Sequence, residues 1–96
     1  MQKVSNALQS IPERIMITRK RLKLDQGDMA ILLNMSRNNY STIENGRCGI
    51  NLEYILLIHE FFHVPLDWLL KGEGSVPNPT LDSEALQLLQ LQGFDA

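Results

Sequence analysis

The chain has 96 residues, of which 44% are hydrophobic and 6% aromatic, enough for one small core plus a tail or an extra helix. No apolar run reaches the ~18 residues that a membrane span needs, and the first ten residues lack the apolar stretch of a secretory signal, so we expect a cytoplasmic protein without membrane contact. The single cysteine, Cys48, excludes an internal disulfide bond.

The net charge of −2 is unevenly distributed along the chain. Residues 1–50 carry eight basic and four acidic side chains, a net charge of +4, whereas residues 51–96 carry one lysine and seven acids, a net charge of −6. A basic front and an acidic back would orient the molecule toward phosphate groups. Because an ordinary mixed surface can have the same balance, charge alone favours a nucleic-acid partner only weakly.

The first half of the chain predicts an arm and two helices. Residues 1–10 show no apolar period and are predicted to be an N-terminal arm. Pro12 suits the first turn of a helix over about residues 12–22, and Asp25 can cap a second helix. The apolar stripe of this second helix consists of Met29, Ala30, Leu32 and Leu33.

A tight turn and a third helix follow. Asn34 tolerates the left-handed backbone that ends a helix, and Ser36 is a good cap for the next one. This third helix runs to about Asn45 and ends at Gly46. Its only strongly apolar side chains are Tyr40 and Ile43, so one narrow stripe is predicted to be buried. The opposite side is polar and carries Arg37, Asn38, Ser41 and Thr42.

The second half predicts three more helices. Asn51 can cap a very apolar helix, LEYILLIHEFFHV, in which Leu52, Ile55, Leu56, Ile58 and Phe62 are expected to line the core. A short helix, LDWLL, follows Pro65, residues 73–79 form a linker rich in Gly and Pro, and residues 80–96 predict a Leu-rich C-terminal helix. The predicted fold is therefore all-α, with five helices and an additional C-terminal one.

Two helices joined by a tight turn, the second with a polar outer side, are typical of a helix-turn-helix, in which one helix braces and the next enters the major groove. Residues 11–72 resemble the phage Cro and repressor type, often called the Xre family. The resemblance depends on Gln26, Ala30, the Glu44–Gly46 segment ENG and the final VPLDWLLKG, all at the family's spacings. It implies a five-helix, repressor-like DNA-binding domain that usually works as a homodimer.

In proteins of this type the first positions of the recognition helix reach base edges. Here these positions are Arg37 and Asn38, followed one turn later by Ser41 and Thr42. Arginine can bind guanine O6 and N7, asparagine can bind adenine N6 and N7, and the methyl group of Thr42 can contact thymine. The alternative is that these side chains are simply solvated on an exposed helix.

Phosphate contacts are expected at the rim, from Gln26, Arg19, Asn45 and Arg47. By the resemblance, Gln26 binds phosphate at the start of its helix and braces the recognition helix. Arg19 can touch phosphate while pairing with Glu44, although a purely internal ion pair is an equal alternative. Asp25 departs from the pattern, because a negative charge beside Gln26 weakens binding unless it is occupied in capping the helix.

The apolar surplus suggests an interface. Tyr54, Leu57 and Phe61 do not share the predicted core face of their helix, and the C-terminal helix is rich in leucine. Such a surplus usually marks an interface or a docked segment. The candidates for a dimer interface are therefore Tyr54, Leu57, Phe61, Leu86 and Leu89. The simpler alternative is that the last helix covers only its own domain.

Other reactive residues indicate no catalysis. His59 and His63 lack a third ligand at a clear spacing, so neither a zinc site nor any other metal or cofactor is expected. Cys48 is interpreted as an incidental thiol rather than a redox sensor. The chain contains neither G-x-x-x-x-G-K nor G-x-S-x-G, and we do not expect an enzyme.

The sequence thus favours a homodimeric transcriptional repressor that reads an inverted repeat in double-stranded DNA with residues 36–45. A second hypothesis is an antitoxin-like module, whose acidic C-terminal part holds a toxin-like protein partner while the front still binds DNA. A third is a scaffold domain that has lost DNA binding, which Asp25 and the acidic total suggest and Arg37 and Asn38 oppose.

Overall fold

A computed structural model describes residues 10–93 of the chain. Within this range the fold is built from helices, without strands: α1 (Ile11–Arg21), α2 (Gln26–Leu33), α3 (Arg37–Glu44), α4 (Leu52–Phe62), α5 (Leu66–Lys71) and α6 (Ser83–Leu91). The predicted all-α class, with five helices and a C-terminal one, is confirmed. The predicted arm at residues 1–10 lies almost entirely outside the described residues.

Local capping explains where the first two helices begin. The Ser10 hydroxyl accepts a hydrogen bond from the Glu13 amide at 3.2 Å, and the Glu13 carboxylate accepts one from the Ser10 amide at 2.7 Å. Asp25 and Asp28 make the same reciprocal pair at the start of α2, at 2.8 and 3.0 Å. These capping boxes satisfy amide groups that a helix start leaves without partners.

The turn between α2 and α3 has the predicted form. Asn34 takes the left-handed conformation, with φ of 56°, and the amide of Met35 donates back to the carbonyl of Ala30 at 2.9 Å. Ser36 then caps α3 by accepting from the amide of Asn39 at 3.1 Å. Gly46, with φ of 74°, follows the C-terminal end of α3. The turn chemistry that the sequence indicated is therefore present at each position.

Buried side chains from α1 to α6 form one hydrophobic core. The contribution of α3 to this cluster is Tyr40. Its largest fully buried side chains include Trp68, Tyr40 and Phe62. The described region contains no helix that is long and apolar enough to cross a membrane.

The core face of α4 differs from the predicted one. Ile55, Ile58, Phe61 and Phe62 are buried, whereas Leu52 is 62% exposed and Leu56 is 39% exposed. Both leucines were expected in the core, and Phe61 was expected to be surplus, so these expectations were wrong. The physical reason is that α4 is apolar around most of its circumference, and the neighbouring helices decide which stripe is buried.

Arg14 makes an unexpected contact within the core. It is only 4% exposed, and its guanidinium donates to the carbonyls of Leu69 at 2.9 Å and Leu70 at 3.1 Å. These carbonyls belong to the last turn of α5, where a positive charge is favourable. The interaction fixes the short helix α5 against α1.

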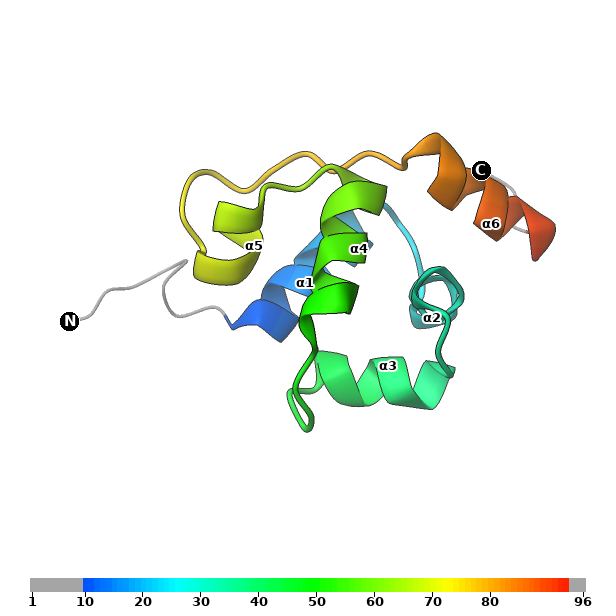
Figure 1. The fold of residues 1–96 in the computed structure, drawn as a ribbon, viewed down its shortest axis with the longest axis horizontal. Helices are drawn as coiled ribbons and strands as arrows, with labels where there is room; N and C mark the ends of the chain where they lie inside the picture. The colour runs from blue at the N-terminus through cyan, green and yellow to red at the C-terminus, as the bar shows by residue number, and fades with distance from the viewer. Residues whose placement is uncertain (1–9, 94–96) are drawn as a thin grey trace.

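The C-terminal helix α6 packs against α2 and α4 of its own chain. In Figure 1 it lies on the side of α2 that is opposite α3. Ala85 and Leu89 are fully buried there, and the segment before α6 is held by the amides of Thr80 and Asp82, which donate to the carbonyls of Phe62 and Phe61 at 3.1 and 2.8 Å. In this structure α6 therefore covers its own domain.

Candidate nucleic-acid interface

The helix α3 runs along one edge of the fold, across the view in Figure 1. Its buried apolar residues are Tyr40 and Ile43. Arg37 and Asn38, at its N-terminal end, are exposed, while Ser41 and Thr42 are half-buried. Because the polar side chains share the outward part of the helix, this edge offers hydrogen-bonding groups to a large polar ligand.

A polar cluster beneath α3 holds this helix in place. The carboxylate of Glu44 accepts from Arg19 Nε at 2.7 Å and Nη2 at 3.0 Å, from Gln26 Nε2 at 3.0 Å, and from the Tyr40 hydroxyl at 2.5 Å. Arg19 Nη1 also donates to the carbonyl of Leu24 at 2.9 Å. One carboxylate thus joins α1, α2 and α3, and directional bonds of this kind fix both the position and the rotation of α3.

The cluster is largely removed from solvent, since the side chains of Arg19 and Glu44 are 12% and 4% exposed. Burial alone would raise the pKa of Glu44, but the hydrogen bonds from Arg19, Tyr40 and Gln26 outweigh burial and hold this pKa below its ordinary value. Burial, followed by the hydrogen bond to Glu44, raises the pKa of Tyr40. The negative charge of Glu44 is therefore retained but neutralised by Arg19, so it does not oppose an anionic ligand at α3.

Gln26 occupies the first position of α2, at the positive end of its helix dipole. Its side-chain amide donates to Glu44 and so contributes to the bracing that the resemblance implied. The neighbouring Asp25 carboxylate accepts from the amide of Asp28 at 2.8 Å. Its capping role occupies the negative charge that seemed to argue against a phosphate contact at this point.

Arg37 reaches back across the start of α2. A methyl group added to Gly27 would lie 3.6 Å from Arg37 Nη1 and 3.2 Å from Asp25 Oδ1. The guanidinium of Arg37 and the carboxylate of Asp25 therefore both border the open side of Gly27. This proximity, which the sequence did not indicate, places the cation of α3 next to the N-terminus of α2 on one surface.

The hydroxyl of Thr42 is already engaged. It donates to the carbonyl of Asn39 at 2.7 Å and lies 3.4 Å from the sulfur atom of Cys48. Its methyl group, rather than its hydroxyl, is the group free to contact a base. Cys48 is exposed in the loop after α3 and packs beside this face.

Asn45 and Arg47 lie at the C-terminal end of α3, and both are exposed. The amide of Arg47 donates to the carbonyl of Thr42 at 3.0 Å, and that of Gly46 donates to Ile43 at 3.0 Å. These bonds close the end of the helix and hold the loop at the edge of the same surface. The eight residues that the sequence suggested for DNA contact thus lie on or beside α3, with Arg19 turned inward to Glu44.

The five interface candidates are not brought together. Phe61 and Leu89 are 6% and 0% exposed and belong to the core of the protomer, so neither is available to a second copy in this conformation. Tyr54, Leu57 and Leu86 are half-buried. The sequence analysis did not predict that Leu52 and Leu56 are exposed. Glu53 and Glu60, which lie beside them on α4, were a signal for a stripe that faces solvent.

The two histidines of the α4 region have separate partners. The helix ends at Phe62, and His63 takes a left-handed conformation with φ of 55°. His59 Nδ1 lies 2.6 Å from the carbonyl oxygen of Val64, whereas His63 Nε2 lies 3.4 Å from Asp82 Oδ1. Across residues 10–93, no group of three or more His, Cys, Asp or Glu side chains is placed to hold a metal ion.

Comparison with known proteins identifies the family. The sequence profile of the helix-turn-helix domain matches residues 13–75, about two thirds of the chain. No curated protein and no solved structure matches the chain. The matched region contains α1 to α5, including the turn at Asn34 and the exposed face of α3. The chain therefore belongs to the helix-turn-helix domain family, and this membership supports DNA binding.

Proposed function

We propose that this protein is a sequence-specific, homodimeric transcriptional repressor of the Cro and Xre type. Each protomer inserts α3 into a major groove, and the two half-sites of an inverted repeat lie about one helical turn, ~34 Å, apart. Repression follows from occupation of promoter DNA by the dimer. The observation that carries this proposal is the exposure of Arg37 and Asn38 on a helix whose orientation is fixed by the Glu44 cluster.

Base contacts are assigned to Arg37 and Asn38, with Ser41 and the methyl group of Thr42 one turn further along. Phosphate contacts are assigned to Gln26, Asn45 and Arg47. Arg19 contributes mainly by positioning Glu44, because its Nε and both Nη atoms donate within the protein. Capping by the Asp25 carboxylate removes the main argument for a domain that has lost DNA binding.

The antitoxin-like alternative gains no specific support from residues 10–93. Its acidic C-terminal part is used largely to cover the protein's own core, since α6 packs against α2 and α4. A toxin-like protein partner is therefore not part of this proposal.

Selection of binding sites from random double-stranded DNA with the purified protein tests the function. We expect an enriched inverted repeat. Arg37→Ala should weaken binding to that site by about 1–3 kcal/mol and relax one base position per half-site, because one bidentate base contact is lost. Lys71→Ala, which removes an exposed cation from α5, is the matched control.

The salt dependence separates the two kinds of contact. Arg47→Ala should weaken binding to all sequences alike and reduce the slope of log K against log salt by about 1, as expected for one lost phosphate contact. A uniform loss of affinity in Arg37→Ala would instead place Arg37 on the phosphate backbone. Absence of any enriched sequence would contradict the proposed function.

A further inference from the structure

We propose that two copies of this chain pair through the outward face of α4, which we call the Leu52–Leu56 face and define as Leu52, Glu53, Leu56 and Glu60. This inference rests on the proposed function and names the surface that joins the two protomers. It differs from the interface suggested by the sequence, because Phe61 and Leu89 are buried within the protomer.

Two of the four residues of this face are apolar where a solvated helix would be polar. Leu52 and Leu56 lie one turn apart and are 62% and 39% exposed. A groove of about 450 Å³ runs beside them between α2 and α4, and it is lined by Leu33, Asn34, Glu53, Tyr54, Leu56, Leu57 and Glu60. Exposed apolar side chains next to a groove of this size are typical of a protein interface.

The position of α3 indicates where a second copy must stand. A recognition helix in the major groove lies across the duplex, so the next half-site is displaced sideways from the helix rather than along it. In Figure 1, α3 runs across the view, with α4 nearer the viewer and α1 behind it. The partner must therefore approach from the α4 side or from the α1 side.

Charge decides between these two sides. The end of α1 carries exposed cations at Lys20, Arg21 and Lys23, which would repel their counterparts in a second copy and are better suited to phosphate groups. Gln26, to which a phosphate contact is assigned, also follows shortly after this segment in the chain. The α4 side remains for the partner.

The Leu52–Leu56 face is also complementary to itself in charge. Glu53 lines the groove on the α2 side, and His59 and His63 line a second pocket with Pro65, of about 490 Å³, toward α5. Glu60 lies between the two and borders both. A two-fold axis parallel to α4, which keeps both copies of α3 on the same side, brings the acidic edge of one copy opposite the histidine edge of the other. Since His63 Nε2 faces Asp82 and His59 Nδ1 faces the carbonyl of Val64 within the protomer, the imidazole nitrogen assigned to a carboxylate of the partner is Nε2 of His59.

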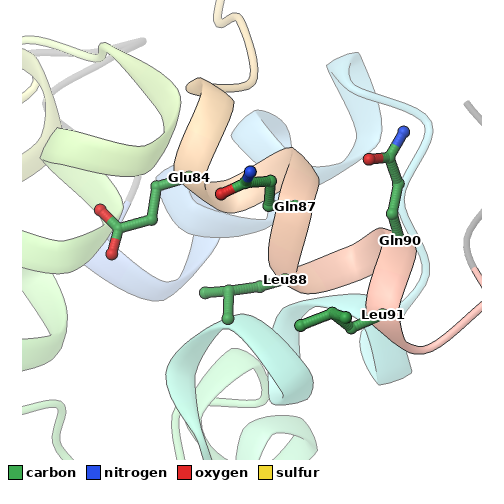
Figure 2. A pocket seen from close by; sticks show the side chains of 5 residues that line it. All are labelled: Glu84, Gln87, Leu88, Gln90 and Leu91. Atoms are coloured by element: carbon green, nitrogen blue, oxygen red, sulfur yellow. The ribbon is translucent and has the colours of Figure 1, made fainter.

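The other exposed leucine does not define a comparable surface. An open cavity of about 520 Å³ lies along α6 and is lined by Glu84, Gln87, Leu88, Gln90 and Leu91. Figure 2 shows these five side chains. Leu91 is 80% exposed, but the cavity is bordered by residues of a single helix, and α6 lies on the side of α2 away from α3. Leu91 and Ile31, which is 37% exposed on α2, therefore provide matched controls.

Sedimentation equilibrium of the full chain without DNA tests the inference. Leu56→Asp should weaken the dimer by at least about tenfold, since it buries an unpaired charge at the centre of the contact. Ile31→Asp, at a site of nearly equal exposure, and Leu91→Asp should leave the dimer unchanged. Urea unfolding of each variant shows that the fold is retained.

A second experiment gives a positive signal and does not depend on a charged substitution. In a Cys48→Ser background, Leu56→Cys should form a disulfide-linked dimer on mild oxidation, whereas Ile31→Cys should not. The inference would be overturned if Leu91→Asp dissociated the dimer while Leu56→Asp had no effect. It would also be overturned if Ile31→Cys formed the disulfide-linked dimer and Leu56→Cys did not. A wild-type chain that stays monomeric would overturn it as well.

These outcomes are separable from failure of the proposed function. If the wild type selects a specific DNA sequence but is monomeric, the pairing surface and the homodimeric state are wrong, whereas sequence-specific DNA binding stands. If the Leu56→Asp monomer and the wild-type dimer both bind DNA without sequence preference, the repressor function is wrong even though the surface is correct.

Discussion

The third and sixth helices are held to the same domain by different physical means. The helix α3 buries two apolar residues, Tyr40 and Ile43, and its attachment also depends on the hydrogen bonds that converge on the buried carboxylate of Glu44. The helix α6 is held mainly by Ala85 and Leu89, which are fully buried against its neighbours. The attachment of α3 relies on directional polar bonds, and that of α6 relies mainly on apolar contacts.

This difference matches what each helix has to do. A helix that reads bases must keep its side chains within a fraction of an ångström of the base edges, and hydrogen bonds in several directions provide this precision. A helix that only covers the core needs to exclude water, which apolar contacts do without directional bonds. The comparison predicts that substitutions in the Glu44 cluster beneath α3 affect both the stability of the fold and the recognition of DNA. Substitutions of the buried residues of α6 should affect stability alone.

The largest effect is expected for Glu44→Gln. This change leaves the Arg19 guanidinium without its anionic partner in a site that is nearly closed to solvent, and removal of one member of a buried ion pair costs about 3–5 kcal/mol. Urea unfolding measures this loss. DNA affinity measured where the variant is still folded should also fall, because α3 loses its bracing. An unchanged affinity would contradict the positioning role of the cluster.

Leu89→Ala should destabilise the fold by about 2–5 kcal/mol, the usual cost of truncating a fully buried leucine. The variant should discriminate between the selected operator and a site with one changed base as well as the wild type does. Leu88→Ala, a half-buried neighbour on α6, is the control and should cost less. A change in base preference would show that α6 also orients α3, and the proposed division would then be wrong.

Asn34→Ala tests the turn that connects the two helices of the motif. The left-handed conformation at φ of 56° is unfavourable for alanine, so we expect a loss of about 1–2 kcal/mol in the free energy of unfolding. Asn34→Gly should be neutral or nearly so, because glycine takes this conformation without steric cost. Equal losses for the two variants would indicate that the asparagine side chain, rather than its backbone, is needed.

The smallest effect is a dependence on pH. The pKa of Glu44 is lowered in the folded protein, so its contribution is present above the ordinary glutamate pKa of about 4.3 and is lost as pH falls through the folded value. Unfolding free energy should therefore fall in acid, and less steeply in Glu44→Gln than in the wild type. The same slope in both proteins would assign the acid sensitivity to other carboxylates.

Local rules made much of the fold predictable. Asp25, Ser36 and Asn51 cap the helices that they were expected to cap, and Asn34 takes the left-handed turn. The polar side of residues 37–42 also follows from the sequence, because a helix with only two apolar residues can bury only one narrow stripe. In these segments, the residues within one or two turns settle the structure.

The helix α4 was different, because its sequence permits several buried faces. Leu52 and Leu56 were assigned to the core and Phe61 to the surface, and the reverse is observed. The contact of Arg14 with the end of α5 joins residues more than fifty positions apart, and no local pattern indicates it. The hydroxyl of Tyr40, regarded as part of an apolar stripe, proved to be a fourth donor group of the Glu44 cluster.

The sequence by itself determined where most helices begin and end and which side of α3 meets solvent, because caps, turns and a sparse apolar stripe act over a few residues. Only the tertiary structure decided which leucines of α4 remain exposed, that α6 covers α2 and α4, and that Arg19, Gln26 and Tyr40 share one carboxylate. The reason is that an apolar helix gains similar free energy from burial on more than one face, and the choice among those faces depends on the shape of the helices packed against it.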